Sequence, residues 1–282
     1  MNIGIFQVPY DSGHFCERTG CGPDYFLENG IIKVLQDDGH HVHIHRIESK
    51  ATLNTEVGTT FELNYTLAEH IQSLPDNCFP LIFSGNCNSC VGALSGVSLD
   101  EIGIIWFDAH GDYNTPDTTI SGFLDGMGLA MATGQCWKTL LQQIPGYKPV
   151  SENNVVHVGS LDLDFEEKRM LEKAGIPIII NNSKDETAFI TLFKDALHNL
   201  GRHVKNVYIH IDMDVLETGL AKANHLALPG GLRVETVINC LTIIKENFKL
   251  SACCIASVDP AFDKDKIVLN AGIRIIKTIF EC

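Results

Sequence analysis

The chain has 282 residues, 45% of them hydrophobic, and a formal net charge of −14 at pH 7. This negative charge argues against nucleic acid and anionic membranes as partners, since Lys and Arg drive binding to both, and no apolar run approaches the roughly 20 residues of a membrane span. The first residues lack the basic segment and cleavage site of a secretion signal, so we expect a cytoplasmic protein whose ten cysteines are reduced thiols.

Apolar segments and helical segments alternate along the chain. Strands are predicted at 2–6, 41–46, 80–84, 102–107, 154–159, 176–180, 206–211 and 252–258. Helices are predicted at 23–38, 62–73, 166–174, 186–201, 233–247 and 265–281. This alternation predicts an α/β fold with a mostly parallel central sheet between two layers of helices. No linker, repeat or charge block divides the chain, so we expect one domain over residues 1–282.

Two early patterns have the spacing of metal ligands. His41, His43 and His45 alternate with apolar residues, and we interpret them as the solvent-facing side of a strand near the sheet edge. Cys87 and Cys90 have the spacing of a redox or zinc pair, but no second pair follows at zinc-ribbon spacing. Neither pattern predicts a metal site as well as the acidic clusters that follow.

The first acidic cluster directly follows the strand predicted at 102–107. Asp108, His110 and Asp112 stand at positions i, i+2 and i+4. Residues two apart in an extended chain share a face, so the three side chains converge if the extended conformation continues. Hard oxygen donors with one nitrogen suit a divalent cation such as Mn²⁺. An exposed loop carrying these residues by chance is the alternative.

The second acidic cluster follows the strand predicted at 206–211. Asp212 and Asp214 repeat the i, i+2 spacing, and the C-terminal edge of a parallel sheet is where open α/β folds bind ligands. Two strands that end in carboxylates there would bring the clusters together. Five ligands are more than one hydrated metal needs, so the set favours two metals bridged by Asp108 and Asp212, about 3.5–4 Å apart.

Taken together, these motifs resemble the metal signatures of the ureohydrolases, the superfamily of arginases and agmatinases. Asp-Ala-His-Gly-Asp at 108–112 and Asp-Met-Asp at 212–214 carry the resemblance. It extends over nearly the whole chain through the segments at 3–23, 84–92, 158–164 and 229–232. The resemblance implies an arginase-like α/β/α domain with two Mn²⁺ that hydrolyses a guanidino group.

The resemblance also implies roles for the acidic residues. Asp108 and Asp212 would bridge the metals, His110 and Asp214 would complete one of them, and Asp112 would bind the other. Asp112 would in addition take the proton of the attacking hydroxide and pass it to the leaving amine, which is general acid–base catalysis.

Three further residues match substrate contacts of arginases. Asn114 and Ser121 match positions that hold the amino-acid end of arginine, and Asp164 matches the carboxylate that holds its α-amino group. This set favours arginine over agmatine, which lacks the carboxylate. The structural alternatives are a turn at Asn114-Thr115-Pro116 and a helix cap at Asp164.

At one metal-ligand position the chain departs from the family. The family has a histidine where we place Asn88, and an amide oxygen binds Mn²⁺ more weakly than an imidazole. The thiolate of Cys87 or Cys90 is a possible substitute. The second metal site therefore depends on a weaker ligand than the first.

Two further departures concern the reaction itself. Asp125 stands where the family has a proton-shuttle histidine, and this carboxylate would move protons or bind a cation. Ser257 stands where the family has the glutamate that grips the guanidinium. Asp259, two residues further on, would share the strand face of Ser257 and supply the missing carboxylate.

These departures are typical of a specialised branch that resembles arginase-like enzymes of natural-product biosynthesis and peptide modification. We expect hydrolysis of arginine, or of a modified or peptide-borne arginine, to an ornithine-type product and urea or a substituted urea. The alternatives are an agmatinase-like enzyme and a catalytically impaired member with a structural role. Family members are commonly homo-oligomers, so we expect one here.

Overall fold

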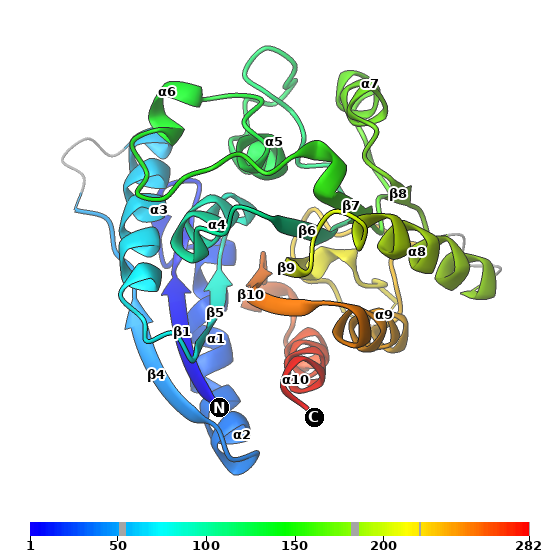
Figure 1. The fold of residues 1–282 in the computed structure, drawn as a ribbon. Coiled ribbons are helices and arrows are strands. Elements are labelled where there is room, and N and C mark those ends of the chain that lie inside the picture. The colour runs from blue at the N-terminus through cyan, green and yellow to red at the C-terminus, as the bar shows by residue number, and fades with distance from the viewer. Residues whose placement is uncertain (51–54, 182–185, 220, 282) are drawn as a thin grey trace.

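An eight-stranded sheet forms the centre of the computed structural model, which describes residues 1–50, 55–181, 186–219 and 221–281 (Figure 1). Its order is β4-β1-β5-β10-β9-β6-β7-β8, and every neighbouring pair runs parallel. The strands are β1 Asn2–Val8, β4 His41–Arg46, β5 Cys78–Ser84, β6 Ile102–Phe107, β7 Val155–Val158, β8 Ile178–Ile179, β9 Asn206–Asp212 and β10 Lys249–Ala256. A short hairpin, β2 Tyr10–Asp11 and β3 His14–Phe15, lies outside the sheet.

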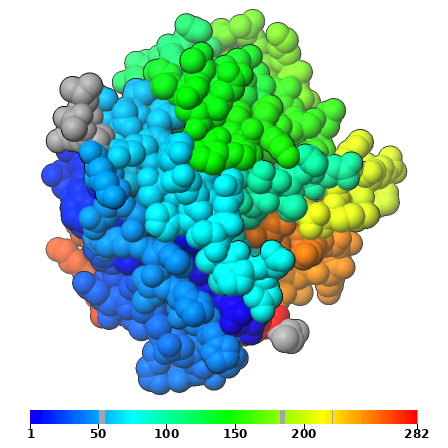
Figure 2. Space-filling view, turned by 60° about the vertical axis from the view of Figure 1, so that its left-hand side comes forward, coloured from blue at the N-terminus to red at the C-terminus, as the bar shows by residue number. Residues whose placement is uncertain are grey.

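Helices cover both faces of the sheet, as Figure 1 shows. One face packs against α1 Gly22–Glu28, α2 Ile31–Asp37, α8 Glu186–Leu200, α9 Val234–Asn247 and α10 Ile267–Phe280. The other packs against α3 Glu56–Gln72, α4 Cys90–Val97, α5 Gly128–Ala132, α6 Lys138–Leu141 and α7 Phe165–Ala174. In Figure 2 the blue and cyan N-terminal part of the chain covers most of the side in view, with the green segment above it.

Both sides of each central strand are buried because both faces carry helices. In β6, Ile105 and Phe107 belong to one hydrophobic core, and Ile104 and Trp106 belong to the other. A strand buried on both faces has a continuous apolar run instead of an alternating one. This explains the uninterrupted sequence Ile102–Phe107 and confirms the predicted α/β architecture.

All eight predicted strands are present, with small differences at their ends. The helix predicted at 23–38 is two helices, because Gly30 adopts a left-handed conformation with φ 95°. The helix predicted at 62–73 begins earlier, at Glu56, where the side chain of Thr55 caps it by accepting from the N–H of Gly58. Neither difference alters the order of the layers.

Helix α4 was absent from the prediction, because small residues replace its apolar stripe. Gly92 and Gly96 lie against α3: a Cβ on Gly92 would lie 2.7 Å from the carbonyl oxygen of Asn64, and one on Gly96 would lie 2.5 Å from Ile71 Cβ. The glycines that allow α4 to pack closely on α3 are also the residues that lower the helix propensity of α4.

The cysteines agree with their prediction, and the histidine strand agrees only in part, because His45 is half-buried. β4 is an edge strand of the sheet, and His41 and His43 are exposed on it. His45 stacks on Phe6 with ring centroids 4.7 Å apart. The nine cysteines in the described part of the chain are free thiols. None of the described helices is both long and apolar enough to cross a membrane.

The chain order brings four strand ends together at the C-terminal edge of the sheet. After β5 the chain crosses over β10 and β9 to reach β6, so the segments that follow these strands meet where the order of strands changes. Open α/β sheets bind ligands at such a point. Residues 84–88, 108–114, 212–214 and 257–259 all follow strands at this edge.

Gly85 offers a test of how closely the N-terminal hairpin packs on this edge. A Cβ at this position would lie 2.2 Å from the carbonyl oxygen of Tyr10 and 2.7 Å from the Cα of Gly20. Backbone atoms cannot yield as a flexible side chain would, so Gly85→Ala should lower the free energy of unfolding by about 2 kcal/mol. Urea denaturation measures this. Gly126→Ala is the control, because no atom lies within 4 Å of its added Cβ.

Candidate metal centre

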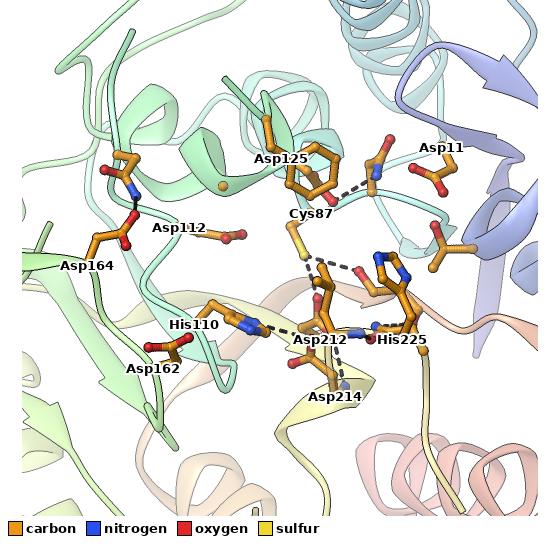
Figure 3. Close-up of a pocket in the computed structure, with 18 of the residues that line it drawn as sticks. Asp11, Cys87, His110, Asp112, Asp125, Asp162, Asp164, Asp212, Asp214 and His225 are labelled. Carbon is orange, nitrogen blue, oxygen red and sulfur yellow. Dashed lines mark hydrogen bonds and ion pairs between the residues drawn. The ribbon is translucent and has the colours of Figure 1, made fainter. Parts of the chain in front are cut away.

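The two acidic clusters meet in one cavity of about 240 Å³ at the C-terminal edge of the sheet. Figure 3 shows His110, Asp212, Asp214 and Cys87 converging there. Asp108 and His110 follow β6, Asp212 ends β9 with Asp214 after it, and Cys87 follows β5. The predicted convergence of the two strand ends is therefore what the structure shows.

One group of ligand atoms comes from Asp108, His110 and Asp214, all within 4.8 Å of one another. His110 Nδ1 lies 3.5 Å from Asp108 Oδ1 and 3.3 Å from Asp214 Oδ2. The two carboxylates hold the pKa of His110 at about 12, although burial alone would lower it. A divalent cation between these atoms would take the place of that proton.

A second group comes from Cys87, Asp108 and Asp212, again within 4.8 Å. The thiol of Cys87 donates to Asp212 Oδ2 at 2.9 Å and lies 3.4 Å from Ser257 Oγ. Asp108 belongs to both groups, which fits a ligand shared by two cations. Asp212, predicted as the second bridge, is part of one group only.

Asp108 is held from several directions. Its Oδ1 accepts the backbone N–H of His110 at 2.8 Å, and its Oδ2 accepts the indole N–H of Trp106 at 3.0 Å. Trp106 in turn stacks on His210, with ring centroids 3.7 Å apart, and Tyr208 Oη lies 3.0 Å from His210 Nδ1. A buried aromatic stack thus fixes the shared carboxylate from beneath.

Asp112 reaches the cavity by a different route from the predicted one. β6 ends at Phe107, and Asp112 adopts a left-handed conformation with φ 48°, so the extended alternation stops before it. Its Oδ2 is buried and has no hydrogen-bond partner. Burial, and then the charge of Asp108, raise the pKa of Asp112 well above its usual range.

Several carboxylates share this small space with a single positive charge, that of His110. Burial raises the pKa of Asp108 to about 6, and burial together with Asp214 raises that of Asp212. No lysine or arginine is among the described residues that line the cavity. Uncompensated buried charges are costly, and the buried Oδ2 of Asp112 has no hydrogen-bond partner. Hard oxygen donors with one imidazole and one thiol therefore fit a pair of divalent ions.

The prediction for Asn88 needs correction. Asn88 is not among the residues that line the cavity, and its backbone N–H donates to Asp125 Oδ1 at 3.0 Å. Residues 87–89 form a single 3-10 turn, in which neighbouring side chains point in different directions. Cys87, named as a possible substitute, is the residue whose side chain enters the cluster.

A second wall of the cavity carries the predicted contacts to an amino-acid end. Asn114 Nδ2 donates to Asp164 Oδ2 at 3.1 Å, and Figure 3 shows Asp164 at this wall. Asp164 is also the N-cap residue of α7, so the capping interpretation is confirmed, and the substrate contact stays a prediction. Glu167 accepts the N–H groups of Tyr113 and Asp164, and burial raises its pKa to about 7.

Two predicted substrate contacts lie elsewhere. Ser121 is exposed and its Oγ accepts the N–H of Phe123, outside the cavity lining. Ser257 lines the cavity, but it adopts φ 64° directly after β10 ends. The i, i+2 alternation therefore does not extend to Asp259, which is outside the lining and accepts the N–H of Ala261. Asp259 does not supply the missing carboxylate.

Asp125 enters the cavity as predicted, and both of its oxygens accept hydrogen bonds. Asn86 Nδ2 donates to Oδ2 at 2.7 Å, and the N–H of Asn88 donates to Oδ1. Burial raises the pKa of Asp125 to about 7, despite these two donors. A carboxyl with this pKa exchanges protons near neutral pH.

Several lining residues were not predicted from the sequence. Asp162 and Glu167 had a signal, since they flank Asp164 and Glu167 stands three residues after a capping residue. Some of the others neighbour predicted residues, and the rest come from distant segments with no local pattern. The unpredicted residues are Asp11, Thr19, Asn86, Phe123, Gly126, Asp162, Glu167, Asn224, His225 and Leu226.

Comparisons with known proteins place this geometry in a family. The sequence model of the Arginase family matches residues 1–281. The arginase of Bacillus caldovelox is 26% identical over 294 residues, which cover 99% of this chain and 97% of the relative. The structure of Bacillus cereus arginase superposes with a TM-score of 0.90 at 24% identity, covering 100% and 99% of the two chains. Entamoeba histolytica arginase in complex with L-ornithine superposes at 0.87 with 20% identity, covering 100% and 98%.

The buried carboxylates predict how pH affects the metal-free protein. Asp108 and Asp125, with folded pKa values of about 6 and 7, keep protons that the unfolded chain loses near pH 4. The unfolded state then binds fewer protons at these two positions, so they lower stability as pH rises from about 4 to 7. His157 and His210, whose pKa burial lowers to about 3, act in the opposite direction up to about pH 6.5. Above that pH only the loss remains, and the raised pKa of His110 continues it. Thermal melting of the EDTA-treated protein should show the decline above about pH 6.5.

The same melting series contains its own checks. Asp125→Asn should make the decline shallower, because it removes one of the groups with a raised pKa. Added Mn²⁺ should raise the melting temperature most at high pH, where protons no longer compete for the carboxylates. A metal-free protein that becomes more stable between about pH 6.5 and 8 would contradict this assignment of charges.

Proposed function

This chain belongs to the arginase family of hydrolases, and from that premise we propose that it uses two Mn²⁺ to hydrolyse the guanidino group of arginine or of a modified or peptide-borne arginine. The products would be an ornithine-type compound and urea or a substituted urea. The observation that carries the proposal is the pair of ligand groups that share Asp108, whose other members His110, Asp214, Asp212 and Cys87 line one cavity. Two divalent cations, when bound, lower the pKa of a water and so supply a nucleophile at neutral pH.

The residues of the chain divide the remaining tasks. Asp108, His110, Asp214, Asp212 and Cys87 would hold the cations. The unpartnered Oδ2 of Asp112 is free to accept a proton from the nucleophile and return it to the departing amine. The guanidino carbon is a weak electrophile, and such proton transfer is typically worth 10²–10⁴ in rate.

The second wall supports an amino-acid substrate. Asp164 offers a carboxylate to an α-amino group, and Asn114 holds that carboxylate in place. Glu167 and Asp162 add negative charge to the same wall. A ligand with an ammonium group at one end and a guanidinium at the other would therefore find carboxylates at both ends. Agmatine also has an amine, so it would satisfy this wall. Because Ser121 lies outside the cavity lining, the preference for free arginine over agmatine is weaker than the sequence predicts.

Exposed apolar residues in the segments that carry two cavity residues favour a peptide-borne arginine as a second candidate substrate. Ile120 and Phe165 are 84% and 80% exposed. They lie in the segments that carry Asn114 and Asp164, both of which line the cavity. Exposed apolar side chains next to a binding site suit contacts with a larger partner.

Metal binding and turnover give the first test of this function. The purified protein, loaded with Mn²⁺, should bind two ions per chain and release urea from arginine, hydroxy-arginine, agmatine or an arginine-containing peptide. Asp212→Ala should remove measurable turnover, because it deletes a ligand of the second group. Cys87→Ser should weaken the second ion and spare the first. Elemental analysis and a urea assay measure both effects.

The two variants separate the possible outcomes of this test. Two bound ions without turnover on any of the four substrates would favour a catalytically impaired family member. Failure to bind Mn²⁺ at millimolar concentration would contradict the metal centre itself. Full activity of Asp212→Ala would show that this residue is not part of the site.

Asp164 tests the recognition of the amino-acid end. Asp164→Asn keeps a similar shape but removes the charge that faces the α-amino group, so the KM for arginine should rise roughly 10- to 100-fold. The kcat should change much less, because the reacting end is unaltered. Steady-state kinetics measure both. Asp117→Asn is the control: Asp117 is exposed in the loop that carries Asn114 and does not line the cavity, so an equal rise in its KM would contradict the assignment.

A further inference from the structure

We propose that Asn86 is a positioning residue for Asp125, and that Arg18, through Asp11 and Ser12, holds Asn86 in the orientation which this task requires. The inference rests on the proposed function, because it assigns Asp125 a part in that reaction. It extends the site from the cavity to a surface arginine that does not line it. Four consecutive hydrogen bonds connect Asp125 to Arg18.

The first contacts lie inside the cavity. Asp125 is 7% exposed and Asn86 is 6% exposed. Asn86 Nδ2 donates to Asp125 Oδ2 at 2.7 Å, while the N–H of Asn88 donates to Oδ1 at 3.0 Å. Two donors on the two oxygens fix the plane of the carboxylate, and Figure 3 shows a dashed hydrogen bond at Asp125.

The next contact decides which way the Asn86 amide points. The backbone N–H of Ser12 donates to Asn86 Oδ1 at 2.8 Å. Because this oxygen is already the acceptor, the other end of the amide must be the donor toward Asp125. An aspartate at position 86 would satisfy Ser12 but would face Asp125 with a second charge.

The last contacts hold Ser12 itself. Ser12 adopts φ 50°, a conformation that serine rarely takes. Its Oγ donates to Asp11 Oδ1 at 2.9 Å, and Arg18 Nε donates to Asp11 Oδ2 at 2.6 Å. Burial alone would raise the pKa of Asp11, but the hydrogen bond from Arg18 lowers it below its usual range, so Asp11 remains an acceptor for both.

The position of Arg18 makes the inference testable from outside the cavity. Its side chain is 48% exposed, whereas that of Asp11 is 6% exposed. Removing the guanidinium leaves the buried carboxylate of Asp11 without its ion-pair partner. Asp11 then no longer fixes Ser12, whose hydroxyl it accepts. We expect Asp125 to lose its orientation without any change in the residues that would hold metal.

An exchange of the two side chains is the decisive experiment. In Asn86→Asp with Asp125→Asn, each hydrogen bond of the wild type has a counterpart, and only the direction of the bond between the two side chains is reversed. The charge, however, moves from position 125 to position 86. Stability in urea should return to near the wild-type value in the double variant, whereas Asn86→Asp alone should be destabilised by two facing carboxylates.

The kinetics of the same variants show whether the contact serves the reaction. Asn86→Ala should lower kcat roughly 10- to 100-fold with little change in the KM for arginine, since the amino-acid wall is untouched. The exchanged double variant should remain slow although it is stable. Recovery of both stability and kcat in the double variant would overturn the inference, because the pair would then have only a structural role.

Arg18→Ala extends the test to the surface, with Arg274→Ala as its matched control. Arg274 is 53% exposed and pairs with Glu235 at 3.1 Å, outside the cavity lining. Arg18→Ala should lower kcat while both Mn²⁺ remain bound, and Arg274→Ala should leave kcat unchanged. Equal kcat in the two variants would overturn the connection to Arg18.

Urea unfolding decides the inference independently of the proposed function. If the wild-type protein hydrolyses no guanidino compound, the proposed function fails, but the contacts still make a prediction. Arg18→Ala and Asn86→Ala should be non-additive in their effect on stability, as should Asn86→Ala and Asp125→Ala, because each pair belongs to one network. Additive effects in both pairs would overturn the inference.

Discussion

The cost of burying carboxylates at the end of a parallel sheet governs the rest of this structure. Asp108, Asp112, Asp212 and Asp214 are all at most 6% exposed, and such charges need compensation. The sheet supplies the positions, since the strands that end here are buried on both faces and direct their next residues into one cavity. Backbone donors and the Trp106 indole supply part of the compensation. A pair of divalent cations would supply the remainder.

Much of this arrangement was predictable because it is local. An apolar strand followed by spaced acids identifies both a sheet edge and its ligands, and two such strands predict a shared cavity. The eight strands and the positions of Asp108, His110, Asp212 and Asp214 agree with that reasoning. Helix α4 was missed because small residues that allow close packing against α3 also hide an amphipathic pattern.

The residues that could not be placed lie where the regular alternation ends. In the 3-10 turn at 87–89 the residue that faces the cavity is Cys87, one position before the predicted Asn88. The side chain that joins the cluster is therefore a thiol and not an amide. The left-handed backbone at Ser257 directs Asp259 away from the cavity. Residues such as Asp11 and His225 reach the cavity through tertiary contacts. No spacing rule reports such contacts, because they depend on segments that are distant in sequence.

Each half of the centre has its own proton donor that a cation must displace. Burial, and then the neighbouring charge of Asp212, raise the pKa of the Cys87 thiol well above its usual range, and Asp108 and Asp214 hold the pKa of His110 at about 12. A cation that enters either half would therefore expel a tightly held proton, so the occupancy of both positions would depend on acidity. The rate profile with pH would then report how many chains are fully assembled before it reports the chemistry they perform.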